Sequence, residues 1–344
     1  MRNTVKKSFY LTLIVILALS VGLIMSPMAG SQAVAETIKI RMVGTLPVGH
    51  ALTNALNLYK QYVEQKSNGR VVVELYPAQQ LYNDKDLVNV IPKGGVDMAI
   101  ANLDMWAGLA PAVGFFSMPL IFESEDHFLR VFHGQAGDIL REELQKIHCK
   151  CLGAIHYGTA DLMFKTPVSN LEDMHGKRVR AYGQSTSYFL KSLGMAPVMM
   201  SSGEYYAALQ KGTIDGVLSG LTSFNSRKLY EVGKYVPDVM IQPIVLFVTI
   251  ANLKFYNSLP QDIQKILSDG AMEIENYTIK AAQEDTIKAR NVLTANGVTF
   301  QKISDAELAR WRKIAVPYMM SKYKENYDPK KADLMLNSLE KEKK

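Results

Sequence analysis

The sequence has few cysteines, too few for a domain stapled by disulfides. Only Cys149 and Cys151 occur in 344 residues, whereas small secreted domains without a large core carry several disulfides. A zinc site would need further ligands, and the nearby His148 and His156 form no recognised ligand spacing. We expect two thiols on the same face of a strand, with a strained disulfide between them as the alternative.

Catalytic fingerprints are also missing. The sequence contains no G-x-G-x-x-G, G-x-x-x-x-G-K-[ST], H-E-x-x-H or G-x-S-x-G motif. The nearest serine motif, GQSTS at residues 183–187, lacks its second glycine, and the six histidines show no triad or metal spacing. We therefore expect a protein that is not an enzyme, with no cofactor and no metal. A secreted hydrolase or isomerase is the alternative.

A strong charge of either sign is lacking as well. The formal net charge is +6, and removal of residues 1–35 with their three cations leaves +3 (6 − 3). That is too little to indicate nucleic-acid binding, and no cluster of Lys and Arg alternates with aromatic residues. The 48% hydrophobic content predicts a packed core, and the length suggests two domains.

The first 35 residues have the composition of a targeting segment. Arg2, Lys6 and Lys7 precede an apolar stretch at residues 9–25, and "AVA" at residues 33–35 fits signal peptidase. We predict a signal peptide over residues 1–35, cleavage after Ala35 and export to the periplasm. The alternative is an uncleaved anchor, for which the apolar stretch is short.

Beyond residue 36 the hydrophobic pattern predicts a sheet covered by helices. It indicates strand, helix, strand, helix and strand at residues 37–43, 51–67, 70–76, 84–92 and 96–103. The turn before the last of these strands, Lys-Gly-x-(Val/Ile)-Asp at residues 93–97, occurs again at residues 211–215. This alternation is typical of α/β proteins.

The second part of the chain repeats the plan. "HGKRVRAYG" at residues 175–183 matches "NGRVVVELY" at residues 68–76, although the second copy is about 11 residues longer. Ser201 and Glu204 have the spacing of a capping box, and Gly212 is suited to end the helix that follows. We expect two lobes of similar plan.

A long helix is predicted at residues 260–296, where only Gly270 interrupts the pattern. At ~1.5 Å per residue it would reach roughly 55 Å, enough to brace both lobes. A last strand and a last amphipathic helix, at residues 305–324, follow it. Because ligands of α/β sheets bind outside the carboxyl ends of strands, two such lobes predict a shared cleft that closes on a small ligand.

Four segments resemble one family. "NGRVVVELYPAQQL", "NLEDMHGKRVR", "GEYYAALQKGTIDG" and "YEVGKY" are similar to recurring motifs of the DctP-type extracytoplasmic solute-binding subunits of TRAP transporters, and they occur in the family's order. The resemblance spans the mature chain. It implies an α/β, two-lobed periplasmic binding protein fold with a ligand cleft between the lobes and a long bracing helix. We expect lobe I to comprise residues 36–157 and about 246–285, and lobe II residues 158–245 and about 286–344.

The resemblance implies a periplasmic receptor that captures a small organic acid and delivers it to integral membrane permease subunits. It also implies a monomer, with a dimer swapped over the long helix as the alternative. The family's signature arginine falls on Arg180, whose guanidinium could meet a carboxylate with two hydrogen bonds. Two alternatives stay open: Arg180 pairs with an internal acid, or a receptor of this fold feeds a membrane sensor.

Departures from the family pattern indicate a site with one arginine. Where many carboxylate-binding relatives have a second arginine, this sequence has Ala160, and Ser219 stands where an asparagine is frequent. We therefore expect a monocarboxylate with an apolar or aromatic body. The candidate ligand-binding residues are Arg180, Tyr157, Trp106, Ser219, Asn102, Tyr182, Phe224, His50 and Asp161. For the aromatic candidates the alternative is a place in the core, and we assign structural roles to Gln80, Asp97, Tyr206, Gln210 and Asp215.

Overall fold

The computed structural model describes residues 37–343, so the predicted signal peptide and its cleavage after Ala35 lie outside the described residues. The predicted α/β fold is confirmed, and it is built on two sheets. The first sheet has the order β2-β1-β3-β10-β4. Its strands are β1 (Ile38–Gly44), β2 (Val71–Tyr76), β3 (Met98–Asn102), β4 (Cys149–His156) and β10 (Leu246–Asn252).

The second sheet has the order β11-β9-β5-β8-β6-β7. Its strands are β5 (Asp161–Phe164), β6 (Arg178–Ala181), β7 (Ala196–Met199), β8 (Gly216–Ser219), β9 (Tyr235–Pro237) and β11 (Thr299–Gln301). The chain passes from the first sheet to the second through residues 157–160 and returns through residues 238–245. The predicted lobe boundaries at 157/158 and 245/246 fall in these two segments, and the full division into lobes stays a prediction.

Helices pack on both sheets, and the helices predicted at residues 51–67, 84–92, 260–296 and 305–324 are confirmed. The α-helices are α2 (Ala51–Lys66), α3 (Asp84–Val90), α4 (Ala112–Phe116), α5 (Glu125–His133), α6 (Gln135–Lys146), α7 (Gln184–Ser192), α8 (Tyr205–Gln210), α9 (Leu221–Ser226), α10 (Leu253–Ser258), α11 (Gln261–Ala295), α12 (Asp305–Glu325) and α13 (Pro329–Lys341). Short 3-10 turns are η1 (Leu103–Trp106), η2 (Glu172–Met174) and η3 (Leu229–Glu231).

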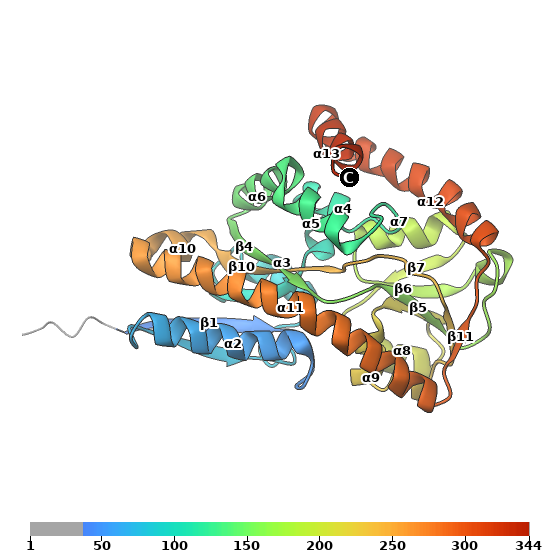
Figure 1. Cartoon of the computed structure of the whole chain (residues 1–344), viewed down its shortest axis with the longest axis horizontal. Helices are drawn as coiled ribbons and strands as arrows, with labels where there is room; N and C mark the ends of the chain where they lie inside the picture. Colours follow the sequence, from blue (N-terminus) through green and yellow to red (C-terminus); the bar gives the residue numbers. More distant parts are fainter. Residues whose placement is uncertain (1–36, 344) are drawn as a thin grey trace, which may run out of the picture. The chain divides into compact units, whose positions relative to one another are not determined.

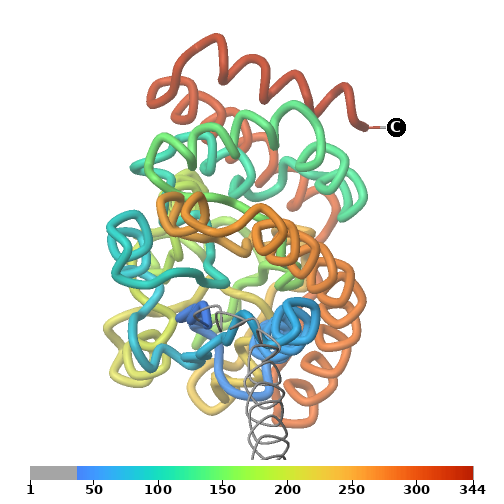
Figure 2. Tube along the Cα trace, turned by 90° about the vertical axis from the view of Figure 1, so that its left-hand side faces the viewer, coloured from blue at the N-terminus to red at the C-terminus, as the bar shows by residue number. Residues whose placement is uncertain are grey.

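The sequence predicted that the helix at residues 305–324 would be the last one, and this is wrong. α13 follows it, beginning with a proline in the first turn, and the side chain of Asp328 accepts a hydrogen bond from the backbone nitrogen of Lys331 at 2.9 Å. α13 packs against α4, α5 and α6, while α12 packs against α7 (Figure 2). The C-terminal helices are therefore part of the packed structure.

The two sheets contain the same arrangement of four strands. β1 pairs in parallel with β2 and β3, and β6 pairs in parallel with β7 and β8. An antiparallel strand then follows, β10 beside β3 and β5 beside β8. The counterpart of β6 is therefore β1. The sequence match between residues 68–76 and 175–183 had paired it with β2 and is wrong by one strand, because β2 and β6 both follow a glycine turn.

The repeated Lys-Gly-x-(Val/Ile)-Asp motif has the same role in both sheets. Asp97, just before β3, accepts hydrogen bonds from the backbone nitrogen of Arg41 at 2.8 Å and from its guanidinium. Asp215, just before β8, accepts the same set from Arg178. Each aspartate thus fixes its strand against the parallel neighbour through charge-assisted hydrogen bonds. This confirms the structural role predicted for both aspartates.

The predicted capping box before α8 forms only in part. Glu204 Oε2 accepts a hydrogen bond from Ser201 N at 2.7 Å, as predicted. Ser201 Oγ donates to the carboxylate of Asp84 and accepts a long hydrogen bond, 3.4 Å, from Gly203 N rather than one from Glu204 N. Gly212 has φ +72°, the left-handed conformation expected where the helix ends.

The predicted bracing helix is α11, which contacts α2 and β4 of the first sheet and α9 beside the second (Figure 1). Gly270 allows a close approach to α2, since a Cβ there would lie 3.0 Å from the ring of Tyr62 and 3.1 Å from that of Tyr59. Glu275 accepts a hydrogen bond from Ala154 N at 3.0 Å, beside a register shift between β4 and β10. α11 is thus tied to the edge of the first sheet.

Cys149 and Cys151 lie on β4, are both buried and are both free, as predicted for two thiols on one face. Burial raises the pKa of Cys149 to about 12 and that of Cys151 to about 11. Across residues 37–343 no helix has the length and apolarity needed to span a membrane. The same stretch contains no group of three or more His, Cys, Asp or Glu placed to hold a metal ion.

Candidate functional site

A cavity is lined by residues of both sheets. The elements of the first sheet contribute Thr45, Leu46, Asp84, Asn102, Val245 and Phe247. The elements of the second contribute Arg180, Tyr182, Ser202, Ser219 and Ser223, and Tyr157 comes from the segment that connects β4 to β5. The lining thus gathers the carboxyl ends of β3, β6 and β8 and the turns after β1 and β7, the edge at which α/β sheets bind ligands.

Arg180 lies on β6 with 3% of its surface exposed. Its Nε donates to Met200 O at 3.2 Å and its Nη1 donates to Leu218 O at 3.1 Å. The guanidinium carbon lies 5.0 Å from the ring centre of Tyr205 and 5.4 Å from that of Tyr182, so the cation is held by carbonyls and aromatic faces.

The charge of Arg180 has no carboxylate partner among residues 37–343. No Asp or Glu there forms an ion pair with it, and Nη2 takes part in none of the hydrogen bonds between described residues. Burial lowers the pKa of Arg180, while Tyr205 and Asp84 oppose that shift. Burying a cation without a counter-ion costs free energy, and an anion in the cavity would supply the missing partner of Arg180. The alternative of a direct ion pair with an internal acid is therefore not what the structure has.

Tyr157 stands in a stack of three rings. His50 lies 5.3 Å from it and Phe247 lies 5.2 Å from it, both with nearly parallel planes. Tyr157 Oη lies 3.3 Å from Ser219 Oγ and accepts a hydrogen bond from Gly220 N at 3.3 Å. The ring and the hydroxyl are thus fixed at the cavity wall, and Gly220 is required there because a Cβ would lie 2.5 Å from the Tyr157 ring.

Asn102 and Tyr182 line the cavity at the ends of β3 and β6. Asn102 Oδ1 accepts a hydrogen bond from Asp104 N at 2.9 Å. Tyr182 Oη donates to Gln242 Oε1, and Gln242 Nε2 donates to Ser117 O at 2.9 Å. Both residues are therefore oriented by neighbours on the connecting segments.

Five of the nine predicted residues line this cavity: Arg180, Tyr157, Ser219, Asn102 and Tyr182. The other four lie behind or away from it. Trp106 and Phe224 are fully buried in the hydrophobic clusters.

His50 and Asp161 have local partners. His50 caps α2, with Nδ1 accepting from Leu52 N at 3.2 Å, and its Nε2 lies 3.2 Å from Thr222 Oγ1. Burial, assisted by Arg227, lowers the pKa of His50 to about 3, so the ring is neutral near pH 7. Asp161 accepts from Thr159 Oγ1 at 2.9 Å, and burial raises its pKa to about 7.

Sequence reasoning missed seven lining residues: Thr45, Leu46, Asp84, Ser202, Ser223, Val245 and Phe247. Several of them had a usable signal, since Thr45 follows β1 directly and Ser202 follows β7. In a sheet of this type the residues after each strand are the ones to examine. Asp84 and Ser223 had none, because they lie on helices that reach the cavity only in the folded chain.

Residues 42–326 match the model of a family described as bacterial extracellular solute-binding protein, family 7 (DctP). The chain belongs to this family. The curated relatives of family 7 include the C4-dicarboxylate-binding periplasmic protein DctP of Rhodobacter capsulatus, 27% identical over 290 residues that cover 83% of this chain and 86% of the relative.

Two solved structures have the same fold. One is a TRAP periplasmic solute-binding protein from Desulfovibrio salexigens with bound orotic acid, with TM-score 0.84, 20% identity and coverage of 89% of this chain and 98% of that one. The other is the sugar acid binding protein DctPAm of Advenella mimigardefordensis in complex with galactonate, with TM-score 0.84, 23% identity and coverage of 89% and 99%.

The resemblance to TRAP solute-binding subunits is thereby confirmed, as is the predicted two-lobed binding-protein fold. Family 7 proteins are extracytoplasmic, bind small organic acids and work with membrane permease subunits. This chain is therefore a solute-binding transport protein and not an enzyme.

Proposed function

We propose that this protein binds a small organic monocarboxylate through Arg180 in the cavity between the sheets, and that it delivers the acid, as a monomer, from the periplasm to its permease. The observation that carries this proposal is the buried guanidinium of Arg180, which has two carbonyl partners and no acidic one among residues 37–343. A carboxylate placed against it would form a charge-assisted pair in a site with little solvent screening.

The charge of the lining supports a single carboxylate. Arg180 is the one cation among the lining residues of the described chain, and Asp84 contributes an acid to the same cavity. A second carboxylate on the ligand would have no cation to meet and would be repelled by Asp84. Position 160, where a second arginine was sought, is a fully buried alanine.

The walls of the cavity support a ligand with an apolar or aromatic body. Tyr157, Tyr182 and Phe247 offer aromatic surface beside the polar Ser219 and Asn102. Orotic acid and galactonate, the ligands of the two structural relatives, each carry one carboxylate.

The test begins with a thermal-shift screen of purified residues 36–344 against organic acids, because a ligand present well above its Kd raises Tm. Calorimetry with the best acid then compares the wild type, Arg180→Ala and the control Arg312→Ala, which removes an exposed arginine. We expect Arg180→Ala to weaken binding by about 2–5 kcal/mol, since the ligand carboxylate is left without its partner. Unchanged affinity in Arg180→Ala would remove Arg180 from the site.

A further inference from the structure

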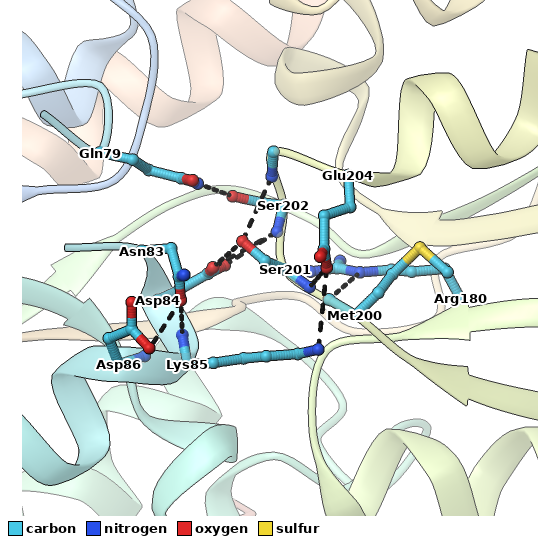
Figure 3. Close-up of polar contacts among 11 residues, drawn as sticks. Gln79, Asn83, Asp84, Lys85, Asp86, Arg180, Met200, Ser201, Ser202 and Glu204 are labelled. Carbon is cyan, nitrogen blue, oxygen red and sulfur yellow. Dashed lines mark hydrogen bonds and ion pairs between the residues drawn. The ribbon is translucent and has the colours of Figure 1, made fainter.

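Two segments from elements of different sheets meet beside the cavity, where Asp84 and Ser202 belong to its lining (Figure 3). One is the loop between β2 and α3 together with Asp84, the first residue of α3, and the other lies between β7 and α8 and contains Ser201 and Ser202. Asp84 Oδ1 accepts a hydrogen bond from Ser201 Oγ at 2.5 Å, and Asp84 Oδ2 accepts one from Ser202 N at 3.1 Å. Asp84 and Ser201 are 5% and 3% exposed, so these bonds are sheltered from water.

Ser202 joins further groups to this contact. Its Oγ accepts a hydrogen bond from Gln79 Nε2 at 2.9 Å and one from Arg227 Nη2 at 3.1 Å. Arg227 Nη2 also donates to Thr45 O, which follows β1, at 3.3 Å. Gln79 and Thr45 belong to elements of the first sheet, whereas Ser202 and Arg227 belong to elements of the second.

The contact is made by protein groups alone, and part of it lies outside the cavity lining. Gln79 and Ser201 do not line the cavity, and both bond to the opposite loop. If the sheets moved apart, Asp84 would lose two donors and Ser202 would lose the amide of Gln79. These bonds therefore favour the closed arrangement whether or not an acid is bound.

We propose that Gln79, Asp84, Ser201 and Ser202 form a latch that stabilises the closed cleft through hydrogen bonds between the two loops. The ligand has to supply the free energy that closure still costs. The latch therefore raises the affinity for any acid, in part through Gln79 and Ser201, which lie outside the cavity lining. This inference rests on the two-sheet fold and does not depend on which acid binds.

The test measures closure without a ligand. Spin labels are placed on Asn57→Cys of α2 and Lys211→Cys after α8, both exposed positions beside different sheets, while Cys149 and Cys151 are buried. The protein is unfolded, dialysed and refolded to remove bound solute, and pulsed dipolar spectroscopy gives the distance distribution. The latch variant is Gln79→Asn with Ser201→Ala; asparagine is tolerated at the positive φ of Gln79 but is shorter.

The control variant carries the same two types of substitution at residues outside the latch. They are Gln80→Asn, next to Gln79, and Ser192→Ala, on α7. Gln80 is exposed, and Ser192 Oγ bonds only within its own helix, to Phe189 O. We expect the wild type and the control to share a short-distance population, and the latch variant to shift toward long distances, with a closed-to-open ratio about tenfold lower. Gln79→Asn alone, on a surface loop, should shift the ratio less in the same direction.

Two results would overturn the latch: a ligand-free wild type without any short-distance population, or a latch variant with the distribution of the wild type. A second arm adds the acid found by screening. Failure of that acid to shorten the distances in any variant would count against the proposed function and would leave the ligand-free result standing.

Discussion

His50 does not line the cavity but supports Tyr157, which does. Its ring stacks on Tyr157 and its two nitrogens are used by Leu52 N and Thr222 Oγ1. Because burial lowers its pKa to about 3, the folded protein holds His50 neutral where the unfolded chain, with a pKa near 6.5, would take up a proton.

This gives a pH prediction with a defined sign. Between pH 6.5 and pH 3 the unfolded state binds the proton of His50 and the folded state does not, so stability falls as pH falls, by up to about 1.4 kcal/mol per pH unit. His50→Asn keeps a capping oxygen and removes the titration. We expect the free energy of unfolding, measured in urea, to fall more steeply from pH 6 to pH 4 in the wild type than in His50→Asn. Parallel pH profiles would show that His50 does not titrate in this way.

The placement of single residues was predictable where a strand end or the family pattern determined it. Asn102 follows from a strand whose carboxyl end the sequence indicated, Arg180 and Ser219 follow from the family resemblance, and all three line the cavity. Trp106 and Phe224 were not predictable, because a large ring near a strand end packs equally well into a core or onto a cavity wall. Both lie in the core, at 0% exposure.

At the scale of elements, the two aspartates of the repeated motif make the same bonds in unequal surroundings. The side chain of Asp97 is 16% exposed and that of Asp215 is 36% exposed. We expect Asp97→Ala to lower the free energy of unfolding by about 2 kcal/mol and Asp215→Ala to lower it by about 1, since solvent weakens the more exposed pair.

Calorimetric melting of the two aspartate variants checks this order. The control is Asp285→Ala on α11. Its partner Lys288 lies three residues further along the helix and is exposed, so this substitution should leave Tm nearly unchanged. An equal loss in both motif variants, or a larger loss in Asp215→Ala, would contradict the assigned order.

Most elements were readable from the sequence, and the exceptions have physical reasons. The apolar spacing of α2, α11 and α12 predicted them closely. α13 was missed because its charged end dominates the pattern, although Ala332, Met335 and Leu339 form a buried stripe at spacings of three and four residues. The sequence matched β6 with β2 instead of β1, because both β2 and β6 are short alternating strands that follow a glycine turn.

At the scale of the whole molecule, two β-α-β-α-β units place one cavity between them, and the long helix α11 contacts elements of both. The sequence predicted this plan because both units carry the same turn motif. It did not predict the contact between Asp84 and Ser201, since hydrogen bonds between loops of different units depend on how the sheets face each other. The latch is therefore a property of the assembled chain.

The most direct measurement of the central claim is a crystal structure of residues 36–344 with the acid selected by screening. The account predicts a single carboxylate within hydrogen-bond distance of the Arg180 guanidinium, with the rest of the acid between Tyr157, Tyr182 and Phe247. An acid bound elsewhere, or bound in this cavity with its carboxylate turned away from Arg180, would contradict it.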